Sequence, residues 1–163
     1  MGSRGSVIPF FQSLKEKDKL PITDPRMTRF MISLEQGVEL VWHAFEDMFG
    51  GEIYVKKIPS MNIIDLANVV VPSAEHEIVG IRPGEKLHEQ MIGEEDSAST
   101  YEYKDHFKIL PATNTTSTNN LMIGTGKLVS EDFSYSSDNN KNWMSISSLK
   151  SWIEDHRATI GKF

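Results

Sequence analysis

The sequence predicts a mixed α/β fold with a small parallel sheet. The 163 residues suffice for one hydrophobic core, and 39% of them are hydrophobic. Strand-like residues 52–58 are followed by a helical stretch from Ser60 to Val71 and by an apolar strand over residues 77–81. Pro72 marks the end of that helix. This strand–helix–strand order is typical of a crossover unit that joins two parallel strands.

The N-terminal residues predict one capped helix followed by two short strands. Ser6 can cap a first helix, and Pro9 falls in its first turn, where a backbone N–H has no helical partner. Residues 20–23 and 28–32 read as strands separated by a turn. Arg29 then lies beside that turn and not deep in a core.

A longer helix is expected after Ser33, which forms a capping-box pattern with Gln36. Gly50 and Gly51 end it. Apolar residues recur at helical spacing along it and predict core packing: Leu34, Val38, Val41, Trp42, Phe45 and Met48.

The most informative stretch is residues 80–89, Gly-Ile-Arg-Pro-Gly-Glu-Lys-Leu-His-Glu. Pro83 and Gly84 predict a tight turn that holds Arg82 and Glu85 close together, at the carboxyl end of a predicted strand. A guanidinium there can bind a diphosphate, and a carboxylate can accept hydrogen bonds from ribose hydroxyls. The alternative is a solvated surface pair that contributes little.

The C-terminal third is less regular. A strand is expected over residues 107–110, and residues 112–142 read as a loop-rich segment. A final helix is expected within residues 143–160, starting at Ser145 or Ser147.

The amino-acid composition of the chain argues against several classes of function. A net charge of −6 argues against a protein that coats nucleic acid or an anionic membrane, and no run of 18 apolar residues exists. The chain has no cysteine, which excludes disulfides and thiolate metal sites and agrees with a cytoplasmic location.

Several motifs that would indicate catalysis are incomplete. Residues 124–127, Gly-Thr-Gly-Lys, lack the rest of a phosphate-binding loop or dinucleotide fingerprint. His76, His88 and Glu89 match no zinc spacing. Tyr101 and Lys104 are three residues apart, not four as in a reductase Tyr/Lys pair. We therefore expect no catalytic, cofactor-binding or metal-binding residue in this chain.

Four ordered segments nevertheless resemble one enzyme family. They are residues 2–11, 21–30, 80–89 and 133–140, the last followed by Trp143. The chain is similar to the C-terminal, substrate-binding part of extended short-chain dehydrogenases/reductases of the CapD-like polysaccharide-biosynthesis group. That group includes the inverting UDP-N-acetylglucosamine 4,6-dehydratases of pseudaminic acid synthesis, which are lyases.

The resemblance implies a UDP-sugar, such as UDP-N-acetylglucosamine, as ligand and NADP as the family's cofactor. The cofactor's Gly-rich turn and the catalytic residues belong to an N-terminal Rossmann half with no counterpart here, so we expect an internal start within a longer gene. Residues 1–163 would form a single substrate-binding lobe, with an α/β core over 1–111. The implied substrate-binding residues are Arg82 for the diphosphate, Glu85 for the ribose, and Arg29 for a phosphate or the uracil. The resemblance also implies that Arg4 lines the ligand where the two lobes meet, that Thr28 adds a hydroxyl contact, and that Pro9 and Phe10 form an apolar wall.

Two alternatives stay open at this point. The chain could be a non-catalytic module that serves assembly, either as a homo-oligomer or with the missing Rossmann half. It could also be the corresponding lobe of a related UDP-sugar epimerase. In each case half of a bilobal enzyme would expose an apolar surface.

Overall fold

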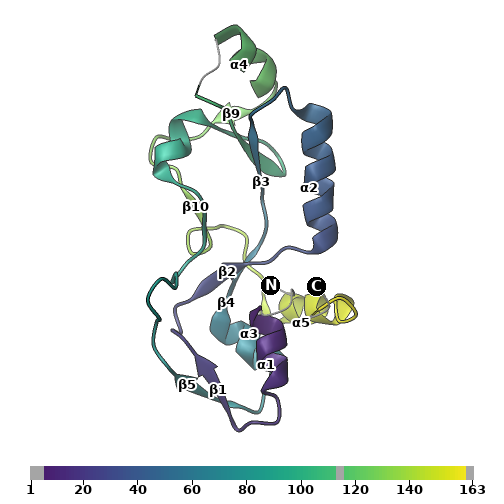
Figure 1. Cartoon of the computed structure of the whole chain (residues 1–163), viewed down its shortest axis with the longest axis vertical. Helices are drawn as coiled ribbons and strands as arrows, with labels where there is room; N and C mark the ends of the chain where they lie inside the picture. The colour runs from purple at the N-terminus through teal and green to yellow at the C-terminus, as the bar shows by residue number, and fades with distance from the viewer. Residues whose placement is uncertain (1–5, 113–115, 161–163) are drawn as a thin grey trace. The chain divides into compact units, whose positions relative to one another are not determined.

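The structure, a computed structural model, describes residues 6–112 and 116–160 (Figure 1). The described residues form two compact units, each assembled from separate segments of the chain. Unit 1 contains residues 6–33, 58–89 and 140–160. Unit 2 contains residues 34–57 and 90–139, apart from 113–115. The predicted single-lobe organisation stays a prediction.

Unit 1 combines two short strand pairs with helices. Its elements are α1 (Val7–Ser13), β1 (Lys19–Ile22), β2 (Thr28–Phe30), β4 (Ser60–Asn62), α3 (Ile63–Val70), β5 (Glu75–Ile78) and α5 (Ile146–Asp155). Strand β1 pairs in parallel with β5, and β2 pairs antiparallel with β4. Helix α3 packs against both α1 and α5.

The apolar core of unit 1 joins these helices to the strands. Its fully buried members include Ile8 and Phe11 on α1, Leu66 on α3 and Leu149 on α5. Ser145 begins α5 as predicted, because its side-chain oxygen accepts a hydrogen bond from the Ser148 N–H.

The predicted crossover unit is wrong in its pairing. Residues 53–56 and 75–78 are indeed strands, but they belong to different units, and the partner of β5 is β1. The helix between them also starts later than predicted. Asn62, not Ser60, caps α3 by accepting a hydrogen bond from the Ile64 N–H at 2.7 Å, because Ser60 is already paired in β4.

Unit 2 is built on an antiparallel sheet. Its elements are α2 (Leu34–Asp47), β3 (Ile53–Lys56), β6 (Gln90–Ile92), a 3-10 helix η1 (Glu94–Ser99), β7 (Thr100–Glu102), β8 (His106–Ile109), α4 (Thr116–Ile123), β9 (Lys127–Leu128) and β10 (Tyr135–Ser136). The strand order of the sheet is β3-β8-β7-β9, and β6 pairs separately with β10. Phe107 on β8 packs against Phe133 and Tyr135, with ring centroids 5.1 Å apart in each case.

Unit 2 differs from the expected elements at two places. The segment 112–142, predicted to be loop-rich, also contains α4, β9 and β10. The apolar stripe of α2 does not pack in a core: all six of its predicted core residues are exposed. The periodicity identified an amphipathic helix correctly, but it carries no information about which face is covered.

Candidate functional site

The predicted turn after β5 is present. The Glu85 N–H donates to the Arg82 carbonyl oxygen at 3.0 Å, which closes a four-residue turn with Pro83 and Gly84 at its centre. Gly84 has φ +82°, a conformation that favours glycine. A Cβ there would meet nothing within 4 Å, so backbone conformation and not space makes glycine the suitable residue. Pro83 and Gly84 therefore account for the turn between Arg82 and Glu85.

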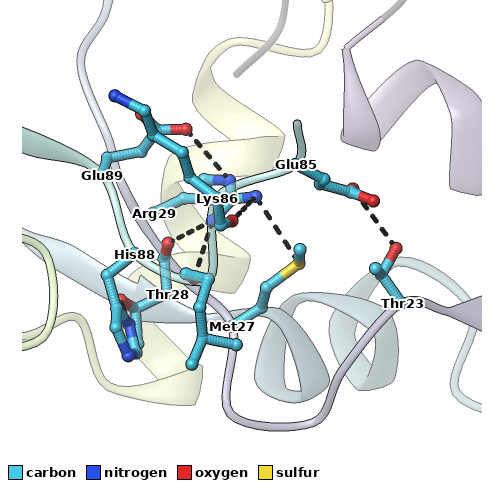
Figure 2. Close-up of polar contacts among 9 residues, drawn as sticks. Thr23, Met27, Thr28, Arg29, Glu85, Lys86, His88 and Glu89 are labelled. Atoms are coloured by element: carbon cyan, nitrogen blue, oxygen red, sulfur yellow. Dashed lines mark hydrogen bonds and ion pairs between the residues drawn. The ribbon is translucent and has the colours of Figure 1, made fainter. Parts of the chain in front are cut away.

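The Glu85 carboxylate is held in place by two donors. Its Oε2 accepts from the Arg82 backbone N–H at 3.3 Å, and its Oε1 accepts from the Thr23 hydroxyl at 3.4 Å (Figure 2). Both hydrogen bonds are long, so the carboxylate keeps capacity to accept bonds from a ligand.

The Arg82 side chain projects from the same turn and is exposed. Within residues 6–112 and 116–160, its guanidinium makes no hydrogen bond and no ion pair. The cation is therefore not neutralised by Glu85, although the two residues share one turn. The pair offers a positive group and a hydrogen-bond acceptor from one short loop.

Arg29, on β2, bonds to the residues that follow the turn, 86–89 (Figure 2). Its Nη1 donates to the carbonyl oxygens of Thr28 and Leu87 at 2.7 and 3.0 Å, and its Nη2 donates to the Lys86 carbonyl at 3.0 Å. Its Nε lies 3.4 Å from Oε1 of Glu89. The planar fork of an arginine suits several acceptors at once, so this side chain positions the loop.

Thr28 and His88 form a second connection between β2 and the loop. The Thr28 Oγ1 lies 2.7 Å from the His88 Nδ1, and the Thr28 N–H donates to the Leu87 carbonyl at 3.2 Å. Thr28 is buried. Its hydroxyl therefore orients the loop from within the fold.

A second arginine, Arg26, pairs with a carboxylate of its own turn. Arg26 donates from Nε and Nη2 to the two carboxylate oxygens of Asp24 at 3.0 and 2.7 Å. These side-chain hydrogen bonds, with a further one from the Arg26 backbone, lower the pKa of Asp24 to about 2. Arg26 is thus engaged by Asp24 in the turn that precedes β2.

The remaining predicted residues are not brought to this loop by any described contact. Arg4 lies outside the described residues. Pro9 falls in the first turn of α1, as predicted, and the half-exposed Phe10 packs its ring 6.0 Å from that of Phe11. Their proposed role as an apolar wall stays a prediction.

Sequence reasoning missed three residues that shape the site. Thr23 positions Glu85, His88 pairs with Thr28, and Glu89 pairs with Arg29. All three lie inside the segments 21–30 and 80–89 that carried the resemblance. Their position in those segments could have indicated a role in the site, whereas their spacing in the sequence indicated none.

The glycine-containing stretch 124–127 contributes to packing in unit 2. There, a Cβ on Gly126 would meet the Tyr103 ring at 2.5 Å, so that glycine serves close packing. Within the described part of the chain, no group of three or more His, Asp or Glu side chains is arranged to hold a metal ion. None of the described helices has the length and apolar character that a bilayer crossing requires. The chemistry that the loop offers is recognition of an anion and of hydroxyl groups.

Comparison with known proteins defines the class. Residues 1–111 match the model of the family described as "Polysaccharide biosynthesis protein", and the chain belongs to this family. The chain is 50% identical over 156 residues to the UDP-N-acetylglucosamine 4,6-dehydratase (inverting) of Campylobacter jejuni, covering 91% of this chain and 47% of that enzyme. These matches confirm the family that the four segments predicted.

More distant relatives extend the match. The UDP-glucose 4-epimerase of Rickettsia massiliae is 40% identical over 114 residues, which covers 67% of this chain and 33% of that enzyme. The crystal structure of Pen from Bacillus thuringiensis matches with a TM-score of 0.77 and 32% identity, over 96% of this chain and 46% of that chain. The chain thus spans about half or less of the length of these relatives.

Proposed function

We propose that this chain is the UDP-sugar-binding part of an inverting UDP-N-acetylglucosamine 4,6-dehydratase that acts in nucleotide-sugar and polysaccharide biosynthesis. The observation that carries the proposal is the 50% identity to an enzyme of that name over 91% of the chain. The turn at Arg82–Glu85 supports it, because an exposed cation and a positioned carboxylate suit the diphosphate and ribose of a nucleotide-sugar.

Each site residue has a proposed role. Arg82 binds the diphosphate and Glu85 accepts hydrogen bonds from the ribose. Arg29 positions the loop and is also proposed to contact a phosphate or the uracil, and Thr28 is proposed to add a hydroxyl contact. Arg4 is proposed to line the ligand, and Pro9 and Phe10 are proposed to form an apolar wall.

The proposed contribution to catalysis is positioning. Binding energy from the remote nucleotide holds the hexose in place for a reaction that other residues carry out. NADP and the catalytic groups of the lyase reaction are assigned to a Rossmann half outside residues 1–163, so a protein of these residues alone should be catalytically silent. A place in pseudaminic acid synthesis and a cytoplasmic location complete the proposal.

Isothermal titration with UDP-N-acetylglucosamine tests the proposal on the chain as it is. We expect saturable binding of the UDP-sugar and of UDP, without turnover of the sugar by the chain alone. Uridine should bind more weakly, because it lacks the diphosphate. An absence of saturable binding by any uridine nucleotide would contradict the proposal.

The second candidate is the corresponding part of a UDP-sugar epimerase, favoured by the 40% identity to the Rickettsia enzyme. The two candidates differ in the preferred hexose. Tighter binding of UDP-N-acetylglucosamine than of UDP-glucose favours the dehydratase, and the reverse order favours the epimerase.

A further inference from the structure

Unit 2 contains a polar cavity beside helix α2. The helix runs alongside β3 (Figure 1), and the turn that joins β7 to β8 lines the cavity together with both of them. The cavity has a volume of about 420 Å³, which suits a small metabolite. The lining side chains that bear on the choice of ligand are Glu39, His43, Lys56, Lys104, Asp105 and His106.

The wall of this cavity includes a buried imidazole with unused hydrogen-bonding capacity. His106 is 9% exposed, and its Nε2 has no hydrogen-bond partner among the described residues. The ring is held by a stack on Tyr103, with centroids 4.6 Å apart, and by an edge contact with the His43 ring at 4.7 Å. Turning the ring toward another partner would break these contacts. Because a buried polar atom without a partner is costly, a ligand that bonds to Nε2 is favoured.

The His106 ring is also neutral near pH 7. Burial lowers its pKa to about 4, and His43 and Lys108 add to the effect. A neutral imidazole donates from one nitrogen and accepts at the other. A ligand group that both donates and accepts, such as an amide, can therefore bond to Nε2 in either tautomer.

The charges around the cavity balance one another. Lys56 and Lys104 are positive, and Glu39 and Asp105 are negative. The Lys56 Nζ lies 3.6 Å from Glu39 Oε2, which is too long for a hydrogen bond, and the Lys56 side chain is only 22% exposed. The side chains of Lys104 and Asp105 make no hydrogen bond and no ion pair within the part of the chain that the structure describes. The cavity therefore offers both a cation and an anion to a ligand.

This balance of charges decides between classes of ligand. A dianion would face the carboxylates of Glu39 and Asp105, and a dication would face the two ammonium groups of the lysines. Each would be repelled by one half of the lining charges and attracted by the other half. A molecule with one charge of each sign can meet an opposite charge at both ends.

We propose that this cavity binds a small zwitterion, a molecule that carries a carboxylate, an ammonium group and a polar side chain, as a polar amino acid does. Lys56 binds the carboxylate, because it is the more shielded of the two cations. Asp105 binds the ammonium group, because the other carboxylate, Glu39, lies beside Lys56. The polar side chain of the ligand bonds to the His106 Nε2.

NMR of the histidine rings tests the proposal on the chain as it is, with L-glutamine as the probe. The side-chain amide of glutamine both donates and accepts, and the chain has only five histidines to follow. We expect saturable shifts of the His43 and His106 signals and none of the His88 signal, since His88 belongs to unit 1. N-acetyl-L-glutamine lacks the ammonium group and L-glutamine amide lacks the carboxylate, so each should bind at least about tenfold more weakly.

Two substitutions test the charged contacts separately. Lys56→Met should weaken the binding of L-glutamine and of N-acetyl-L-glutamine about tenfold, and leave that of the amide unchanged. Asp105→Asn should weaken the binding of L-glutamine and of the amide, and leave that of N-acetyl-L-glutamine unchanged. Lys127→Met is the matched control, because Lys127 lies on β9 of the same sheet but does not line the cavity.

Three outcomes would overturn the proposal. The His106 signal could show no saturable shift with L-glutamine, either derivative could bind as tightly as L-glutamine, or Lys127→Met could weaken binding as much as Lys56→Met does. The proposed function can fail separately. Titration with UDP should shift the His88 signal, because His88 pairs with Thr28 in unit 1, and should leave His106 unchanged.

Discussion

Arg29 Nε lies 3.4 Å from Glu89 Oε1, and the same guanidinium donates to the carbonyl oxygens of Lys86 and Leu87. One side chain on β2 therefore contacts three positions, 86, 87 and 89, of the loop that carries Glu85. The arginine is mostly shielded from solvent, so these bonds are less weakened by water than surface pairs are. The geometry of the candidate site depends on this contact.

We predict that Arg29→Lys loosens the loop although it keeps the charge. A lysine cannot supply the planar set of donors, so the free energy of unfolding should fall by about 1–3 kcal/mol. Trypsin should cleave faster after Lys86, which lies in the loop. Chemical denaturation and timed proteolysis measure the two effects.

Arg26→Lys is the control for this experiment. Arg26 pairs with Asp24 in an exposed turn and does not hold the loop, so its substitution should change little. Equal resistance of Arg29→Lys and the unmodified chain to trypsin would show that Arg29 does not position the loop.

The second prediction concerns the buried ion pair in unit 2. Lys108 is only 2% exposed, and its Nζ lies 2.6 Å from Asp47 Oδ2 and 2.8 Å from the Met122 carbonyl. Burial raises the pKa of Asp47, but hydrogen bonds from Lys108 and Tyr54 outweigh burial and leave that pKa below its usual value.

Removing the two partners should therefore have unequal effects. Asp47→Ala leaves a buried ammonium without its anion and should cost about 2–4 kcal/mol, whereas Lys108→Met leaves a partly hydrated carboxylate and should cost less than about 2 kcal/mol. Urea denaturation of both variants and of the double variant measures the difference. A larger loss for Lys108→Met than for Asp47→Ala would contradict this account of the pair.

Local chemistry made parts of the fold and site predictable. The turn at Pro83–Gly84 follows from residues that fix their own backbone conformation, and the Ser145 cap follows from a side chain that bonds within its own turn. The chain also carries its family signature in contiguous segments. Predictions of this kind need no knowledge of which elements meet.

Non-local contacts were not predictable from the pattern. Strand β5 pairs with β1 and not with β3, and nothing in the strand sequences specifies that choice. The apolar stripe of α2 reads as core in any sequence, because amphipathic periodicity is the same whether or not a partner covers it. The positioning role of Arg29 was not predictable either, because its carbonyl acceptors at positions 86 and 87 lie almost 60 residues away in the sequence.

The third prediction is a dependence of stability on pH through His106. Burial lowers the pKa of His106 to about 4 from 6.5, with His43 and Lys108 adding to the effect and Asp47 opposing it. Its ring stacks on Tyr103 with centroids 4.6 Å apart. Because the folded state binds the proton less tightly than the unfolded state, the contribution is present above pH 6.5 and is lost as pH falls toward 4.

Thermal unfolding between pH 7 and pH 4 should show this loss, which is at most about 3 kcal/mol. His106→Phe keeps an aromatic ring for the stack on Tyr103 and removes the titrating group, so it should flatten the profile between pH 6.5 and 4. An unchanged slope in that variant would assign the pH dependence to other residues.

The central claim is that Arg82 recognises a diphosphate beside a ribose-binding Glu85. Paired isothermal titrations of UDP and of uridine, on the unmodified chain and on Arg82→Ala, test it most directly. The variant should bind UDP about ten- to hundredfold more weakly, as expected for a lost charge-assisted hydrogen bond, while its affinity for uridine stays the same. An affinity of Arg82→Ala for UDP within twofold of the unmodified chain would contradict the claim.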